Sequence, residues 1–114
     1  MNEDCIFCKI GSGDIPSEKV FDDGTAFAIR DINPKAPTHL LLIPYAHVDV
    51  LIGASDEHME AAAHCLRIAP GVAQQAGLEP NGYRLVVNQG PDSGQEVPHY
   101  HLHILGGRRL GPMA

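Results

Sequence analysis

The stretch His99-Tyr100-His101-Leu102-His103-Ile104-Leu105, followed by Gly106-Gly107, carries the strongest structural pattern in the chain. Histidine alternates with large apolar residues, and alternate side chains of a β-strand share one face. The pattern therefore predicts a strand over 99–105 that ends at the two glycines. Its histidines line one face, and Tyr100, Leu102 and Ile104 point into the core on the other.

The spacing of the histidine row favours divided roles for its members. Neighbouring histidines on a straight strand start about 6.7 Å apart, so two can converge on one metal ion but three can hardly do so. A neutral imidazole is available near pH 7, because its reference pKa is about 6.5. The middle histidine, His101, is therefore able to attack phosphorus and form a covalent intermediate, which water then opens. A histidine-rich strand without a function is the weaker interpretation, since three histidines that alternate with apolar residues are an unusual composition for a face that is merely exposed to solvent.

Upstream of this strand, the sequence predicts strands, then a helix, then strands. Apolar runs predict strands near residues 20–21, 26–30, 39–44 and 83–88, and residues 5–10 indicate a turn or the start of a short helix. A helix capped by Ser55 or Asp56 should run to about Gln75. Pro70 lies inside it and predicts a kink or break near 67–70. The hairpin-length links favour an α+β fold with a mainly antiparallel sheet.

Composition and charge exclude several classes of function. The 114 residues fit one domain, 1–114. The formal charge of −6 argues against a polymeric nucleic acid as partner, whereas a single nucleotide needs only a pocket with a few donors. No apolar run approaches the roughly 20 residues of a membrane span, and the acidic N-terminus has no apolar signal core. We therefore expect a cytoplasmic protein that does not engage a membrane.

The three cysteines point away from a disulfide framework, because their number is odd and no signal is present. Cys5-x-x-Cys8 is either a redox pair or half of a metal site, since a closed tetrahedral zinc site needs two further ligands. Cys65 falls in the expected helix and is interpreted as a buried apolar residue. His58 and His64 lie off a common helix face and are expected at the surface.

Taken together, the motifs resemble those of the histidine triad (HIT) family, in its histidine triad nucleotide-binding (Hint) branch. The longest matching stretch runs over 94–108, from Gly94-Gln95-Glu96-Val97-Pro98 through the histidine row to Leu105-Gly106-Gly107-Arg108. The Leu-Gly-Gly-Arg ending is more similar to this branch than to the dinucleoside polyphosphate hydrolases. Further matching stretches, in the same order and spacing, are 5–10, 15–16, 28–34, 36–39, 43–44 and 82–88.

This resemblance implies a fold, an assembly and an activity. The fold is HIT-like, an antiparallel sheet with one long helix and a short N-terminal helix, and two chains form a homodimer. The implied activity is hydrolysis of a purine nucleoside 5′-phosphoramidate to an amine and a nucleoside monophosphate, without an organic cofactor. Three alternatives stay open: a dinucleoside polyphosphate hydrolase, a non-catalytic nucleotide-binding or scaffolding module, and a metal enzyme of the cupin type. The long helix argues against the last of these.

The resemblance also assigns roles to individual residues. His101 is the nucleophile at the α-phosphate, His103 contacts the phosphate and the leaving group, and His39 supports the site. Asp31 accepts both ribose hydroxyls, which suits a carboxylate, although a plain turn residue is the alternative. Asn88 lies near the phosphate or ribose, or merely ends a strand. Backbone N–H groups of the loop formed by Gly94, Gln95, Glu96 and Val97 hold phosphate oxygens. An apolar slot for the base, otherwise simple core, is formed by Ile6, Phe7, Ile10, Ile29, Ile32 and Leu41.

Two features bear on metal and leaving-group chemistry. Members of the family with this cysteine pair hold a structural zinc, and the ligand set they use corresponds to Cys5, Cys8, His47 and His99, all present here. We favour zinc over a metal-free dithiol. Glu96 stands where some members of the branch have a serine that assists the leaving group. A carboxylate donates only when protonated, so Glu96 is expected to alter leaving-group preference, for instance toward a cationic amine.

Overall fold

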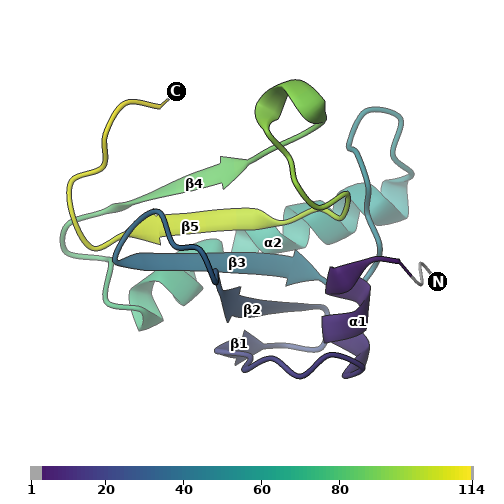
Figure 1. The fold of residues 1–114 in the computed structure, drawn as a ribbon, viewed down its shortest axis with the longest axis horizontal. Helices are drawn as coiled ribbons and strands as arrows, with labels where there is room; N and C mark the ends of the chain where they lie inside the picture. The colour runs from purple at the N-terminus through teal and green to yellow at the C-terminus, as the bar shows by residue number, and fades with distance from the viewer. Residues whose placement is uncertain (1–3, 114) are drawn as a thin grey trace.

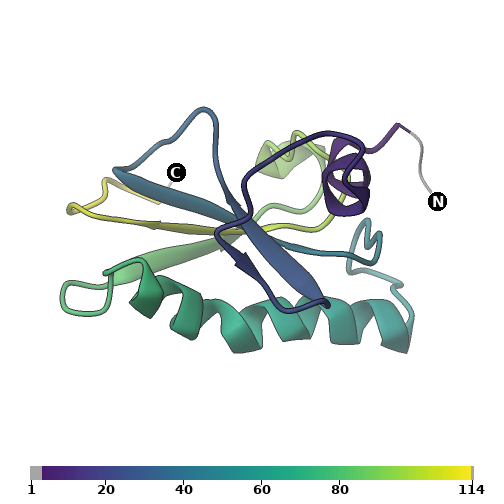
Figure 2. The same cartoon turned by 90° about the horizontal axis from the view of Figure 1, so that it is seen from below.

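The structure, a computed structural model, describes residues 4–113. Five strands form one antiparallel sheet in the order β1-β2-β3-β5-β4 (Figure 1). One long helix, α2, covers one face of the sheet, and the short helix α1 lies over the other face at one end (Figure 2). The predicted α+β arrangement, an antiparallel sheet with one long helix and a short N-terminal helix, is confirmed. In chain order the elements are α1 (Ile6–Ser12), β1 (Phe21–Asp22), β2 (Ala26–Arg30), β3 (Thr38–Pro44), α2 (Asp56–Gln75), β4 (Tyr83–Val87), the 3-10 turn η1 (Pro91–Ser93) and β5 (Leu102–Gly106).

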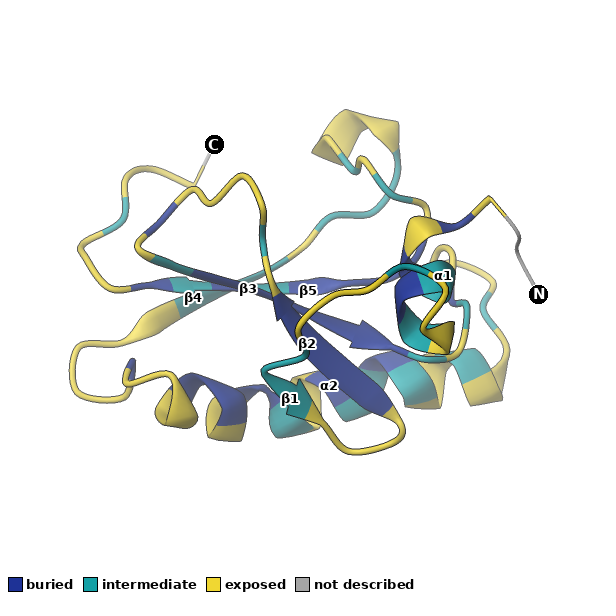
Figure 3. Ribbon diagram, turned by 60° about the horizontal axis from the view of Figure 1, so that its bottom comes forward, coloured by how far each residue is buried: buried dark blue, intermediate teal, exposed yellow. Residues whose placement is uncertain are grey.

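The central strands divide their side chains between the two faces, as strand geometry requires. On β3, Leu40 and Leu42 join the cluster packed under α2, whereas Leu41 and Ile43 join the cluster beneath α1. Figure 3 shows β2 and β3 buried along most of their length, and α2 buried on the side that faces the sheet. This two-sided burial explains why 39–44 reads as an uninterrupted apolar run, and it leaves the α1 face to carry the histidines.

The last strand is shorter than the sequence predicted, because β5 begins at Leu102 rather than at residue 99. Pro44, at the end of β3, has no N–H for a ladder bond, and its carbonyl oxygen instead accepts from Nε2 of His99 at 2.9 Å. The backbone N–H of Tyr100 is donated outside the sheet, to the carbonyl of Val48. Alternation nevertheless continues through this stretch, since Tyr100 packs in the cluster under α2 while the His99 and His101 rings contact Phe7 on the α1 face.

The sequence predicted a kink or break near 67–70; helix α2 runs without interruption past Pro70, so a break there is wrong. Figure 2 shows the helix as one continuous rod. The helix keeps its predicted N-cap at Ser55, and Gly77 follows its end with φ +81°. Pro70 lies on the exposed side, and the carbonyl it leaves without a helical partner belongs to Leu66, whose side chain is 56% exposed. Water can reach that carbonyl, which lowers the cost of the missing hydrogen bond.

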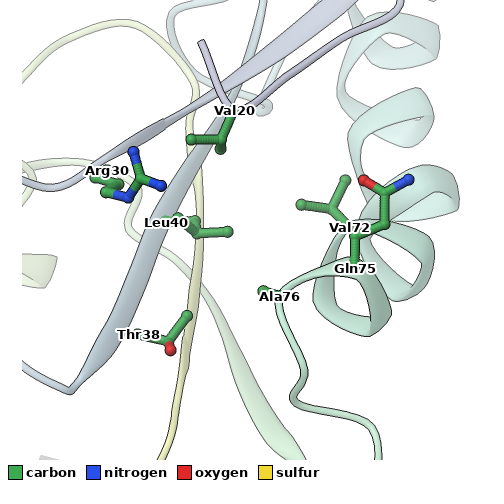
Figure 4. Close-up of a pocket in the computed structure, with 7 residues that line it drawn as sticks. All are labelled: Val20, Arg30, Thr38, Leu40, Val72, Gln75 and Ala76. Atoms are coloured by element: carbon green, nitrogen blue, oxygen red, sulfur yellow. The ribbon is translucent and has the colours of Figure 1, made fainter. Parts of the chain in front are cut away.

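A cavity of about 260 Å³ opens between the last turn of α2 and the sheet (Figure 4). Val72, Gln75 and Ala76 line it from the helix side, and Arg30, Thr38 and Leu40 line it from the strands. Leu40 belongs to the face under α2, so this cavity lies across the sheet from the histidine row. Within residues 4–113, no helix has the length and apolar character needed to cross a membrane.

Candidate functional site

The His101 ring is held in one orientation by the backbone two residues before it. Its Nδ1 atom lies 2.8 Å from the carbonyl oxygen of His99, and a carbonyl can only accept, so Nδ1 carries the proton and donates. The neutral ring therefore keeps its lone pair on Nε2, which has no hydrogen-bond partner among residues 4–113. The edge of Phe7 packs against the ring, with centroids 5.1 Å apart. His101 is 7% exposed, so a nearly buried, oriented imidazole presents one free basic nitrogen.

His39 and His103, 64 positions apart, form a hydrogen-bonded pair beside this ring. The backbone N–H of Lys35 donates to Nδ1 of His39 at 3.0 Å, so the proton of the neutral His39 ring resides on Nε2. That Nε2–H faces Nδ1 of His103 at 2.8 Å, which places the His103 proton on its own Nε2. Nε2 of His103 is buried and has no partner in the described chain. An unsatisfied buried donor next to His101 suits an acceptor that arrives with a substrate.

Burial keeps both rings of this pair neutral. It lowers the pKa of His103 to about 4, with the neighbouring His101 and His39 rings adding to the effect. It also lowers the pKa of His39, where the nearby Asp31 carboxylate pulls the other way. Asp31 lies 3.4 Å from Nε2 of His39, and with His39 neutral this contact is an electrostatic approach rather than an ion pair.

The ligand atoms of Asp31, His39 and His103 also lie close enough together to hold a metal ion. The hydrogen bond from Lys35 argues against that use, since it occupies the Nδ1 lone pair of His39 and leaves a proton on Nε2. A protonated ring nitrogen cannot bind a metal. In this structure His39 and His103 are instead joined by a hydrogen bond, and the Asp31 carboxylate lies beside them.

The apolar slot predicted for a base is only partly assembled. Phe7, Ile10, Ile29 and Leu41 are buried in one cluster under α1, with Val97 packed against it. Ile6 and Ile32 do not join them, being 46% and 96% exposed. Asp31 directly follows β2, and its Oδ1 accepts the backbone N–H of Asn33 at 2.8 Å. Ile32 is thereby held in a turn at the surface.

The loop before the histidine row is shaped by the side chain of Gln95. Its Oε1 accepts the backbone N–H of Gly90 at 2.8 Å, and its Nε2 donates to the carbonyl of Val97 at 3.1 Å. The N–H of Gly94 already donates to Pro91 at 3.0 Å, and the N–H of Gln95 faces the hydroxyl of Ser93. The N–H groups of Glu96 and Val97 have no partner within residues 4–113. Asn88 is half-buried one residue beyond the Val87–Leu102 pair, at the end of β4 nearest His101.

Cys5, Cys8, His47 and His99 come together as a cluster able to hold a metal ion. Nδ1 of His99 lies 3.2 Å from Sγ of Cys5, Nδ1 of His47 lies 3.3 Å from Sγ of Cys8, and the two nitrogens are 3.1 Å apart. A tetrahedral zinc with bonds of about 2.0 Å to nitrogen and 2.3 Å to sulfur separates its ligand atoms by roughly 3.3–3.8 Å.

The tautomer of His99 also fits a metal ligand. Its Nε2–H donates to the carbonyl of Pro44, so the Nδ1 lone pair faces the two cysteines, and burial lowers the pKa of the ring to about 4. Sγ of Cys5 accepts the backbone N–H of Cys8 at 3.3 Å, which suits a thiolate. The residues present therefore fit a zinc ion, and His99 belongs to this cluster rather than to the His101 site.

Sequence reasoning missed two contributors to the site. Lys35 acts through its backbone N–H, which no side-chain pattern reveals. Arg108 lies in the matching stretch over 94–108 but had no assigned role, and its Nη2 donates to the carbonyl of Lys35 at 3.2 Å. The two prolines that flank Lys35, Pro34 and Pro37, were a signal of a rigid loop at this point.

Comparison with known proteins identifies the family. A HIT domain model matches residues 12–110. The chain is 45% identical over 113 residues to the purine nucleoside phosphoramidase of Escherichia coli (strain K12), covering 99% of this chain and 95% of the relative. It is 48% identical over 108 residues to a 14 kDa zinc-binding protein of Zea mays, covering 92% and 83%. The solved structure of a HIT family hydrolase from Legionella pneumophila superposes with a TM-score of 0.88 at 48% identity, covering 95% and 96%.

The chain belongs to the HIT family, as its motifs suggested, and it is a hydrolase of that family. The resemblance to the family is therefore confirmed over nearly the whole chain.

Proposed function

We propose that this hydrolase cleaves purine nucleoside 5′-phosphoramidates at the α-phosphate, with His101 as the nucleophile. The observation that carries the proposal is the 2.8 Å hydrogen bond from Nδ1 of His101 to the carbonyl of His99, which leaves Nε2 free and oriented. The 45% identity to a purine nucleoside phosphoramidase supports the substrate class.

The reaction proceeds in two displacements. Nε2 of His101 attacks the α-phosphorus, and the amine departs with the electron pair of the P–N bond and a proton taken up from water. Water then adds at phosphorus, the bond between phosphorus and His101 breaks, and the nucleoside monophosphate leaves. The fixed tautomer favours this sequence, because the ring needs no rotation or proton transfer before attack.

The donors around His101 suit the phosphate and the leaving-group side. The buried Nε2–H of His103 lacks a partner and can donate to a phosphate oxygen. The free N–H groups of Glu96 and Val97 supply further donors from the loop over 94–97, and Asn88 lies at the same end of the sheet. Both the attacking nitrogen and its charge-stabilising donors are thus drawn from the α1 face.

The nucleoside is bound next to these donors. The carboxylate of Asp31 accepts the two ribose hydroxyls, and the base enters the slot of Phe7, Ile10, Ile29 and Leu41. Ile6 and Ile32 pack onto the base from their exposed positions and lose their contact with water when it binds. An apolar slot of this kind accepts either purine.

We further propose that the cluster of Cys5, Cys8, His47 and His99 binds zinc and that the metal has a structural role. It ties the chain before α1 to the segments that follow β3 and precede β5, and it leaves His101 out of the ligand set. The zinc-binding relative from Zea mays supports the choice of metal.

The chain, 1–114, acts in this proposal as a single HIT domain that pairs into a homodimer in the cytoplasm. Support for pairing comes from β4, which lies at the edge of the sheet. Tyr83 and Val87 on this strand are 38% and 37% exposed, and an uncovered strand edge with apolar side chains is a suitable surface for a second copy.

The test of this proposal is turnover of adenosine 5′-phosphoramidate by the wild-type protein and by His101→Ala, each with and without a chelator. We expect wild-type turnover that survives chelation and a loss of more than about a thousandfold in the variant. A folded wild-type protein that binds the nucleotide without turning the substrate over would favour a non-catalytic binding module. Turnover of a dinucleoside polyphosphate in preference to the phosphoramidate would favour the other hydrolase branch.

A further inference from the structure

The segment that follows β5 packs against the loop between β2 and β3. A Cβ placed on Gly107 would lie 3.0 Å from Cβ of Pro37, and the backbone there has φ +95°, which favours glycine. This close approach places Arg108 over the loop, where its Nη2 donates to the carbonyl oxygen of Lys35 at 3.2 Å. Its Nη1 donates to the carbonyl of Arg109 at 2.8 Å, so the guanidinium is held between two backbone carbonyls.

The two polar groups of the Lys35 backbone therefore serve different partners. The carbonyl oxygen accepts from Arg108, while the N–H donates to Nδ1 of His39 at 3.0 Å. From Nε2 of His39 a hydrogen bond of 2.8 Å leads to Nδ1 of His103. An exposed arginine is in this way connected to the buried, unpartnered Nε2–H of His103 through one residue's backbone and one ring.

We propose that Arg108 is a positioning residue for His39 and His103, acting through the Lys35 backbone. The inference rests on the proposed function, in which Nε2–H of His103 donates to the phosphate. A proton on Nε2 of His103 is favoured while Nδ1 accepts from His39, and donation by Nε2 of His39 is favoured while the Lys35 N–H occupies its other nitrogen. Arg108 holds that N–H in place. Asp31, 3.4 Å from Nε2 of His39, favours the same tautomer from the other side.

The consequence falls on turnover rather than on binding. Asp31 is anchored by its own ladder bond, from its N–H to the carbonyl of His39 at 3.0 Å, and does not depend on Arg108. Loss of the Arg108 contact should therefore leave ribose binding intact while the His103 donor becomes misaligned. A guanidinium acting only through its charge would instead change the KM of an anionic substrate.

Arg108→Ala removes the contact, and Arg109→Ala is the matched control, since it removes the same charge one position away while its carbonyl remains. Both side chains are exposed, so both variants should fold, which thermal unfolding checks. Arg108→Met, which keeps the aliphatic stem, is a second removing variant. Arg108→Lys keeps the charge and one donor and tests rescue.

Three readouts are needed: kcat and KM with adenosine 5′-phosphoramidate, hydrogen exchange of the Lys35 amide, and the ¹⁵N signals of the His39 ring. For Arg108→Ala we expect kcat to fall about fivefold, the ratio that one hydrogen bond supports, with KM changed less than about twofold. In the same variant, the Lys35 amide should exchange faster and the Nδ1 signal of His39 should shift. Arg108→Lys should recover part of kcat, and Arg109→Ala should match the wild-type protein in all three readouts.

Two results would overturn the inference: Arg108→Ala indistinguishable from Arg109→Ala, or a loss of activity with the Lys35 and His39 signals unchanged. A wild-type protein without turnover would count against the proposed function instead. The exchange and ring-nitrogen measurements would then still decide whether Arg108 positions His39.

Discussion

The imidazole of His101 donates a 2.8 Å hydrogen bond to the backbone carbonyl of His99, and this contact joins two sites with separate chemistry. The ring of His99 faces the cysteine pair, while its carbonyl orients the neighbouring histidine. The same short stretch of chain therefore contributes one candidate metal ligand and one candidate nucleophile. The division follows from alternation along an extended backbone, in which ring and carbonyl point in different directions.

Metal removal should destabilise the protein without abolishing turnover. We expect Cys8→Ser, or treatment with a strong chelator, to lower the Tm by at least about 8 °C, equivalent to roughly 2 kcal/mol for a domain of this size. Turnover at a temperature where the protein stays folded should change less than about threefold, because the His99 ring remains bonded to Pro44. Cys65→Ala is the control, since it removes a buried thiol outside the cluster. Abolished turnover in a folded, metal-free protein would show that the metal takes part in catalysis.

The pH dependence of stability should report the burial of His103. Its pKa is lowered to about 4 in the folded protein, from 6.5 in an unfolded chain, so the unfolded state binds more protons between these values. The stabilisation is complete above about pH 6.5 and is lost as the pH falls toward 4. The side-chain amide of Asn in His103→Asn can still accept from His39 but does not titrate. Between pH 7 and 4.5, the unfolding free energy of this variant should therefore fall by roughly 1–3 kcal/mol less than that of the wild-type protein. If chemical denaturation gave the same pH dependence of unfolding free energy for both proteins, the result would contradict the lowered pKa of His103.

Glu96 should set a preference among leaving groups. Its side chain is exposed and has no hydrogen bond within residues 4–113, so its charge is available to a departing amine. Glu96→Gln should lower kcat/KM about three- to tenfold for a phosphoramidate whose amine carries an additional positive charge, and less than twofold for the unsubstituted one. Asp92→Asn, in η1 of the same loop, controls for the loss of one exposed charge. Equal effects on both substrates would exclude a role in leaving-group selection.

Replacement of Pro70 should stabilise the protein. Pro70→Ala restores an N–H opposite the carbonyl of Leu66 and removes the steric cost of proline inside α2. The gain should be about 1–3 kcal/mol, reduced by the greater freedom of the unfolded chain, and visible as a rise in Tm. A lower Tm for Pro70→Ala would show that the proline packs favourably in its present place.

The alternating row of histidines and apolar residues was sufficient to predict which side chains face the helix and which face the site. It did not predict where the strand begins, because that depends on Pro44 and Val48, more than fifty positions away along the chain. The break at Pro70 was predicted wrongly because exposure of one helix face is a tertiary property. The hydrogen bonds of His39 could not be predicted from the sequence for a similar reason, because the tautomer of its ring is set by a backbone N–H in a loop. Ile6 and Ile32 illustrate a further limit, since the resemblance to the family places them in an apolar slot, whereas the structure leaves both side chains exposed.

The most direct test is intact-protein mass spectrometry of the enzyme quenched with base, which preserves a phosphoramidate bond to histidine, shortly after mixing with adenosine 5′-phosphoramidate. We expect a covalent adenylate on the wild-type protein that maps to His101, appears before the first turnover is complete and is absent from His101→Ala. Turnover without any adduct, or an adduct on another residue, would contradict nucleophilic catalysis by His101.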